Sequence, residues 1–290
     1  MKQPGKILLS IFFALFASMT SSRENVSVPL IKPSFMSRSV DGVFGKPSNI
    51  KHSGSPAVVI LHHGGGCLGS QTPQYAVSLN SAGYFTLEPC LFANSQTRSG
   101  SYSGYLGQVF SSLRYLAQFP GVDKTRIAVI GGSHGGNLAL IAAFTWAYKN
   151  HGDLTLPHFS AHAPFYPTCF RFEQMRNGKQ FSDLPLTALD SFTDASIRIY
   201  AGGRDDYEDR DPMSCDSMIK SLASKAQERI SIKMFDEATH GWDHGSTYSF
   251  FTSAACKGRG CQNTNESRPD ITQQGIADLI EFLAQAMPAN

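Results

Sequence analysis

The sequence predicts an α/β protein with a mostly parallel central sheet and helices on both of its faces. Segments typical of strands alternate along the chain with segments typical of helices. Several of the strand segments are continuous apolar runs, as expected when both faces of a sheet are covered. The chain has 290 residues, 41% of them hydrophobic, which suffices for one domain with a single large core.

The expected elements follow one another in regular order. The β-prone residues 26–31 predict a hairpin within 26–50. The run A-V-V-I-L-H at 57–62 predicts the first core strand, because it is apolar throughout. After it we expect helix 73–82, strand 84–88, helix 102–119, strand 126–130, helix 138–148, strand 160–166, strand 196–201, helix 212–226, strand 230–235 and helix 271–286.

The charge balance argues against a nucleic-acid partner. Lys and Arg total 25 and Asp and Glu total 23, which gives a formal net charge of +2 at pH 7. No run of basic residues provides the clustered positive face that nucleic acids require. No stretch after residue 20 is long and apolar enough to span a bilayer. We therefore expect neither a nucleic-acid partner nor a membrane span in the mature chain.

The first residues have the layout of a secretory signal peptide. Lys2 and Lys6 precede an apolar run at 7–17, and small and polar residues follow it. The run is shorter than a stable membrane anchor requires. We expect residues 1–22 to be a signal peptide, residues 23–290 to form a single domain, and the mature protein to be exported, either to the periplasm or to the medium. A buried N-terminal helix is the alternative.

Export decides how the cysteines are interpreted. An even number of cysteines in an oxidising compartment favours disulfides, although free buried thiols are the alternative. The chain offers no Cys or His spacing typical of zinc, and we expect no metal site. The sequence leaves the pairing open, although Cys256 and Cys261 enclose a short loop. The six cysteines are Cys67, Cys90, Cys169, Cys215, Cys256 and Cys261.

A G-x-S-x-G motif at 131–135 lies between a predicted strand and a predicted helix. In this setting the turn is sharp and exposes the hydroxyl of Ser133. Side chains at Gly131 and Gly135 would collide with neighbouring backbone. The free N–H groups of the following helix favour negative charge at this point. The motif predicts Ser133 as a nucleophile, and a glycine-rich turn with an incidental serine is the alternative.

A serine hydroxyl is a weak nucleophile and needs a base. With this motif the chain order is serine, acid and then histidine. His240 follows the last predicted strand and is the candidate base, with His244 as the runner-up. The acid is expected after strand 196–201, where Asp205 is the first candidate and Asp206 its rival. Its task would be to hold the histidine in the correct tautomer.

Acyl transfer also requires donors for an oxyanion. One candidate is the backbone N–H of His134, directly after the serine. The other is the N–H of Gly64 or Gly65, in the H-H-G-G-G-C stretch at 62–67, where glycine lets the backbone approach a substrate closely. No nucleotide- or phosphate-binding pattern is present, and we expect no cofactor.

Six stretches together resemble the dienelactone hydrolase family of α/β-hydrolases over about residues 55–287. The resemblance implies the α/β-hydrolase fold and a triad of Ser133, Asp205 and His240. The subgroup with F-Y-P-x-C implies a disulfide between Cys169 and Cys215. The stretches are V-V-I-L-H-H-G-G-G at 58–66, S-A-G-Y at 81–84, P-G-V-D-K-T-R-I-A-V-I-G-G-S-H-G-G at 120–136, F-Y-P-T-C at 165–169, G-G-R-D-D-Y at 202–207 and A-T-H-G-W-D at 238–243.

The founding members of that family open lactones with a cysteine, whereas this chain has a serine, which favours ordinary esters. The predicted function is that of an exported serine hydrolase that cleaves a small-molecule carboxylic ester, thioester or lactone through an acyl-enzyme on Ser133. An exported peptidase of the same fold and a non-catalytic binding protein are the alternatives. Residues 170–190 could form a lid, and Tyr102, Phe92 and Trp242 either line a pocket or pack in the core.

Overall fold

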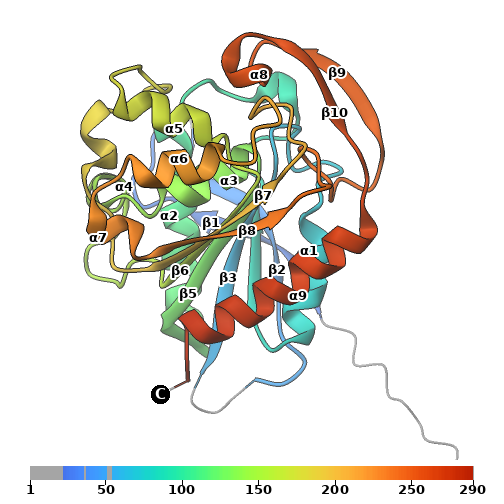
Figure 1. Ribbon diagram of the computed structural model, residues 1–290. Helices are drawn as coiled ribbons and strands as arrows, with labels where there is room; N and C mark the ends of the chain where they lie inside the picture. The colour runs from blue at the N-terminus through green and yellow to red at the C-terminus, as the bar shows by residue number, and fades with distance from the viewer. Residues whose placement is uncertain (1–21, 36, 51–53, 290) are drawn as a thin grey trace, which may run out of the picture.

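The structure is a computed structural model that describes residues 22–35, 37–50 and 54–289 (Figure 1). The predicted signal peptide therefore lies outside the described residues, apart from its last position. Eight strands form one sheet in the order β1-β2-β4-β3-β5-β6-β7-β8. β2 runs antiparallel to both of its neighbours, β1 and β4, and all other neighbouring strands of this sheet pair in parallel. The strands are β1 (Arg23–Pro29), β2 (Ser39–Gly45), β3 (Ser55–Leu61), β4 (Phe85–Pro89), β5 (Val122–Gly132), β6 (Ala161–Phe165), β7 (Ser196–Gly202) and β8 (Ile230–Phe235).

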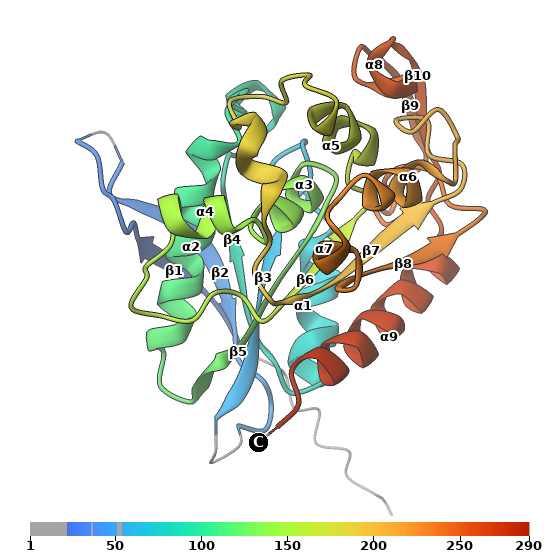
Figure 2. The ribbon, with the colours of Figure 1, turned by 60° about the vertical axis from the view of Figure 1, so that its left-hand side comes forward.

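Helices cover both faces of this sheet, as predicted (Figures 1 and 2). On one face lie α1 (Thr72–Ser81) and α9 (Pro269–Ala286), whose apolar side chains pack with alternate residues of β3, β5 and β6. The larger core lies on the opposite face. The remaining helices are α2 (Ser103–Gln118), α3 (His134–Ile141), α4 (Thr145–His151), α5 (Cys169–Arg176), α6 (Ser214–Lys220), α7 (Ser224–Gln227) and α8 (Ala255–Gly258), with 3-10 turns at Ser95–Thr97 and Leu186–Asp190.

The prediction of one helix over 138–148 is wrong, because α3 and α4 are separate. Phe144 has an extended backbone and forms an isolated antiparallel bridge with Phe192. Hydrogen bonds on either side of that bridge, from Thr193 N–H to Ala143 C=O and from Thr145 N–H to Ser191 C=O, replace helical ones. The predicted helix 212–226 is likewise divided into α6 and α7, since Ala223 is extended.

A second, two-stranded sheet was not predicted. It consists of β9 (Tyr248–Thr252) and β10 (Cys261–Asn265), with α8 at its tip. A disulfide between Cys256 and Cys261 closes that tip. We call residues 248–265 the hairpin arm. It arches over the carboxyl ends of the sheet strands (Figure 1).

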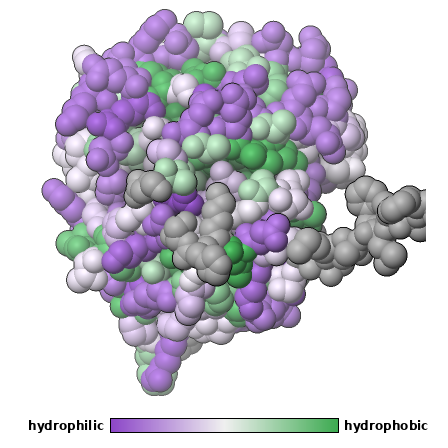
Figure 3. All heavy atoms as spheres, turned by 90° about the horizontal axis from the view of Figure 1, so that it is seen from below, coloured by the Kyte–Doolittle hydropathy of each residue, from purple (hydrophilic) through white to green (hydrophobic). Residues whose placement is uncertain are grey.

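The two ends of the sheet differ in what surrounds them. The hairpin arm, α5 and the long connections gather at the carboxyl ends of the parallel strands (Figures 1 and 2). The opposite end, seen in Figure 3, presents hydrophilic side chains mixed with smaller hydrophobic patches. In open parallel sheets, ligand sites form at the carboxyl ends. A ligand site is therefore expected at this end of the sheet, beside the hairpin arm.

Candidate active site

The turn between β5 and α3 is sharply strained. Ser133 has φ 52° and ψ −110°, a conformation that a side-chain-bearing residue rarely adopts. Glycine is required on either side. A Cβ on Gly131 would lie 2.6 Å from the carbonyl carbon of Gly135, and a Cβ on Gly135 would lie 2.5 Å from the carbonyl oxygen of Leu61. The turn leaves Ser133 half-exposed at the N-terminus of α3.

A chain of hydrogen bonds connects Ser133 with the two side chains that the sequence selects. Oγ of Ser133 lies 2.8 Å from Nε2 of His240, and Nδ1 of His240 lies 2.8 Å from Oδ2 of Asp205. Both His240 and Asp205 are buried. The other oxygen of Asp205 accepts from the backbone N–H of Tyr207 at 2.8 Å, which fixes the carboxylate. The arrangement allows proton transfer from the serine to the histidine.

The two rival residues have other partners. Asp206 forms an ion pair with Arg210 at 2.7 Å and accepts from the backbone N–H of Thr264 at 2.8 Å, so it fastens the hairpin arm. His244 has its Nδ1 2.7 Å from the hydroxyl of Tyr248, on the same arm. Neither rival contacts Ser133 or His240 by a hydrogen bond in the described structure.

Two tyrosines enclose the ring of His240. Tyr207 packs over it with 4.1 Å between centroids, and Tyr166 meets it edge-on at 5.0 Å. Tyr166 has φ 36°, so its backbone is strained, and its hydroxyl donates to Asp243 at 2.6 Å. Tyr75 of α1 donates to the other oxygen of Asp243, also at 2.6 Å. Burial raises the pKa of Asp243 and of both these tyrosines.

Two of the predicted oxyanion donors, Gly64 and His134, lie close to each other. The position of a Gly64 Cβ is 3.8 Å from Cβ of His134, so the two loops are in contact. The N–H of Gly65 donates to Nδ1 of His63 at 2.9 Å. No hydrogen bond among the described residues uses the N–H of Gly64 or of His134. Both N–H groups are therefore free of hydrogen bonds within the described residues, as an oxyanion donor requires.

A pocket of about 290 Å³ opens at Ser133. Its charged lining consists of Arg98 and Arg171, so the pocket is positively charged. Burial lowers the pKa of His134 in this lining to about 3, with a further contribution from Arg98. Burial also lowers the pKa of His62 to about 4, so both imidazoles are neutral at pH 7 and add no charge. Part of the predicted lid segment forms one wall, through Arg171, Phe181 and Ser182.

Of the three aromatic residues considered for this pocket, only Tyr102 lines it. Trp242 is fully buried and packs against Phe165, Tyr166 and Phe235, so placing it in the pocket is wrong. Phe92 packs against His134 from the core side. A larger cavity of about 690 Å³ lies over β1, β2 and the end of β4, but it holds none of Ser133, His240 or Asp205.

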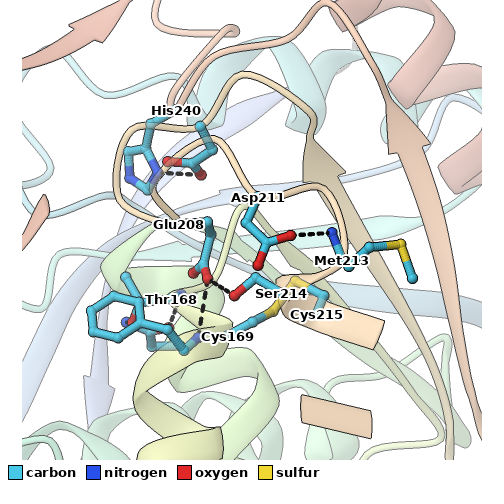
Figure 4. The surroundings of a disulfide bond; sticks show 11 residues. Thr168, Cys169, Glu208, Asp211, Met213, Ser214, Cys215 and His240 are labelled. Atoms are coloured by element: carbon cyan, nitrogen blue, oxygen red, sulfur yellow. Dashed lines mark hydrogen bonds and ion pairs between the residues drawn. A yellow bond between two sulfur atoms is a disulfide. The ribbon is translucent and has the colours of Figure 1, made fainter. Parts of the chain in front are cut away.

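Residues 203–213, between β7 and α6, carry Asp205 and are called the acid loop. Below this loop, the predicted disulfide between Cys169 and Cys215 is present and joins α5 to α6 (Figure 4). Beside it, the buried carboxyl of Glu208 accepts from the N–H of Phe170 at 3.1 Å and from the hydroxyl of Ser214. Burial and the charge of Asp205 raise the pKa of Glu208 to about 8. The third disulfide joins Cys67 to Cys90. All six cysteines are paired.

Sequence reasoning missed several residues that shape this site. Arg98, Arg171 and Tyr207 lie in loops and α5, where no periodicity distinguishes them. Asp243 was part of the A-T-H-G-W-D stretch but received no role. Only the proximity of Asp243 to the candidate base, three positions along the chain, could have drawn attention to it.

Two other classes of feature are absent from the described residues. Among the described residues, no group of three or more His, Cys, Asp or Glu side chains is arranged to hold a metal ion. No helix in the described part of the chain has the length and hydropathy needed to cross a membrane.

Comparison with known proteins adds the fold family. The family model described as alpha/beta hydrolase fold matches residues 58–224. Esterase 2 of Thermogutta terrifontis, phosphoramylated by tabun, is 16% identical over 93% of this chain and 97% of its own, with a TM-score of 0.65. A candidate dienelactone hydrolase from Klebsiella pneumoniae is 14% identical over 92% and 99%, with a TM-score of 0.60. No curated protein matches the sequence.

A third solved structure has the same fold within a longer chain. It is a candidate dipeptidyl aminopeptidase IV from Bacteroides ovatus, 14% identical over 93% of this chain and 36% of its own, with a TM-score of 0.62. Such distant likenesses establish the fold and leave the reaction to the site. The match to the family model covers more than half of the sequence, and the chain belongs to the alpha/beta hydrolase fold family.

Proposed function

We propose that the protein is an exported serine esterase of the dienelactone hydrolase type that cleaves carboxylic esters through an acyl-enzyme on Ser133. The observation that carries this proposal is the hydrogen-bonded order Ser133, His240 and Asp205, with 2.8 Å at both steps. Esterases among the structural neighbours support a hydrolase. Three disulfides are in keeping with an oxidising compartment.

In the first half of the reaction, Oγ of Ser133 attacks the carbonyl carbon while its proton moves to Nε2 of His240. The N–H groups of Gly64 and His134 are our candidates to stabilise the resulting oxyanion, since the N–H of Gly65 is already engaged by His63. The ester C–O bond then breaks, and His240 returns the proton to the departing alcohol. The acyl group remains on the serine oxygen.

In the second half, a water molecule gives a proton to His240 and attacks the acyl carbon. The bond to Ser133 breaks, the serine recovers its proton and the carboxylic acid is released. Asp205 keeps the proton-bearing Nδ1 of His240 oriented throughout and stabilises the imidazolium. Apart from the ester and the water molecule, every group in these steps belongs to a residue of the chain.

The test is hydrolysis of p-nitrophenyl acetate, butyrate and octanoate by the mature protein, with Ser133→Ala beside it. We expect the activity to disappear in Ser133→Ala, and a fluorophosphonate probe to label the wild type at Ser133 only. An aminoacyl p-nitroanilide serves as the comparison for the peptidase alternative. Equal ester hydrolysis by both proteins would remove Ser133 from the mechanism. No hydrolysis together with no labelling would favour a non-catalytic binding protein.

A further inference from the structure

The hairpin arm presents aromatic side chains beside the pocket that the proposed mechanism does not use. Tyr248 and Phe250 of β9 remain 39% and 38% exposed. Successive side chains of a strand point to opposite faces, so Tyr248, Phe250 and Thr252 share one face of the arm. Thr252 lines the pocket at Ser133, which identifies this shared face as the one turned toward the site.

A row of aromatic rings connects the two features. The ring of His63, next to the candidate oxyanion glycines, stacks on His244 at 4.1 Å. His244 is nearly parallel to Tyr248 at 6.2 Å, and Tyr248 to Phe250 at 5.9 Å. At such separations parallel rings overlap only in part, so a portion of the face of Tyr248 and Phe250 stays open. The row therefore leads from the oxyanion loop to an exposed aromatic surface.

The arm is held firmly enough to define a surface. Backbone N–H groups of Cys256 and Lys257 donate to the carbonyl groups of Asp206 and Tyr207, at 2.8 and 2.9 Å. Within the arm, Asn265 donates to the hydroxyl of Tyr248 at 2.8 Å, and the N–H of Thr264 donates to the carboxylate of Asp206 at 2.8 Å. The contacts with Asp206 and Tyr207 fix the arm to the acid loop, next to His240. Pre-organised aromatic side chains bind flat rings at low entropic cost.

The lining of the pocket determines what this surface would meet. Thr252 belongs to the lining of the pocket of about 290 Å³ at Ser133, whereas Tyr248 and Phe250 do not, so a part of the ester that contacts these two rings lies just outside the pocket. We propose that Tyr248 and Phe250 form a subsite for an aromatic ring. The ring belongs to the part of the ester, acyl or alcohol, that lies outside the pocket. This inference rests on the proposed esterase function and adds the class of substrate, an aryl-bearing ester.

Phe250 is the residue to vary, because the hydroxyl of Tyr248 forms hydrogen bonds with Asn265 and His244, and its removal would disturb the arm. Phe251, 69% exposed on the opposite face, is the matched control. The substrates are methyl butyrate, benzyl butyrate and methyl 3-phenylpropanoate, followed by pH-stat, so that the ring is absent, on the alcohol or on the acyl group. We expect wild type and Phe251→Ala to prefer one of the two aryl esters. In Phe250→Ala the preference should fall by about tenfold, with methyl butyrate unchanged.

A second measurement separates this inference from the proposed function. In a Ser133→Ala background, which does not turn over, saturation-transfer NMR reports the contact between the protein and the ring protons of the preferred aryl ester. We expect the ring signals to persist with Phe251→Ala and to weaken with Phe250→Ala. If wild type hydrolyses no ester but these signals behave as expected, the subsite stands and the esterase proposal fails. No difference between the Phe250 and Phe251 variants, in either measurement, would overturn the subsite.

Discussion

The ring of Tyr166 lies edge-on against the imidazole of His240, with 5.0 Å between centroids, while its hydroxyl donates to Asp243. The carboxylate of Asp243 is fully enclosed and accepts from Tyr75 as well. Asp243 thus joins the loop after β8 to α1 and to the turn after β6. The backbone strain at Tyr166 is sustained by this network, which positions the candidate base.

We therefore predict that Tyr166→Phe lowers kcat by about tenfold with little change in KM, because His240 loses a fixed neighbour. Tyr75→Phe is the control, since it removes the other hydrogen bond to the same carboxylate without touching His240. Each substitution should cost about 1–3 kcal/mol of stability, as a buried acceptor loses one partner. Ester kinetics and urea melts of both variants measure this. Equal losses of kcat would show that Tyr166 acts only through stability.

The two adjacent aspartates should differ sharply in their effect on activity. Asp205→Asn removes the acceptor that orients Nδ1 of His240, and kcat should fall by roughly a thousandfold or more. Asp206→Asn weakens an ion pair with Arg210 that is largely exposed on the arginine side, and kcat should stay within about threefold of wild type. Steady-state hydrolysis of p-nitrophenyl butyrate distinguishes the two. The reverse order of effects would assign the acid role to Asp206.

That choice shows where sequence reasoning ends. Asp205 and Asp206 are neighbours in one loop, and their different tasks follow from partners far along the chain, His240 and the N–H of Thr264. The G-x-S-x-G turn, by contrast, can be recognised from five consecutive residues. The steric demand at Gly131 comes from Gly135 of the same motif, although Gly135 itself meets Leu61 of the neighbouring strand β3. Local patterns thus identify the turn, while tertiary contacts decide between similar side chains.

The same distinction holds for the fold. Core strands such as β3 are predictable because burial on both faces imposes a continuous apolar run. The hairpin arm was missed because β9 is largely exposed and the buried residues of β10 are asparagines, so neither strand alternates apolar with polar residues. The break between α3 and α4 was missed because it depends on a backbone bridge to Phe192, a residue far along the chain.

The buried carboxyl of Glu208 predicts a pH dependence of stability. Burial and Asp205 raise its pKa from 4.5 to about 8, while Ser214, the N–H of Phe170 and Lys257 oppose the shift. Between these two values the folded state holds a proton that the unfolded state has released. The stabilising contribution is therefore complete below pH 4.5 and is lost as the pH rises through about 8.

Glu208→Gln cannot titrate, so we predict that it flattens the decline in stability between pH 5 and pH 9. The difference from wild type should amount to a few kcal/mol over that interval. Urea melts at several pH values measure it, with the exposed Glu281→Gln as the control. Parallel curves for wild type and Glu208→Gln would show that Glu208 ionises as readily in the folded state as in the unfolded chain.

The disulfides of α5 and of the hairpin arm differ in the length of chain that they close. Cys169 and Cys215 are 46 positions apart, whereas Cys256 and Cys261 are 5 apart. The loop-closure model gives about 4 kcal/mol for the first and about 2 kcal/mol for the second. Thermal melts of the two Cys→Ala double variants should show this order, with roughly 10 °C lost against roughly 5 °C.

The loss for the Cys169–Cys215 pair should be increased further by the cavity left between α5 and α6, where both sulfurs are buried. A larger loss for the 256–261 pair would mean that the fixed arm contributes more to stability than loop closure predicts.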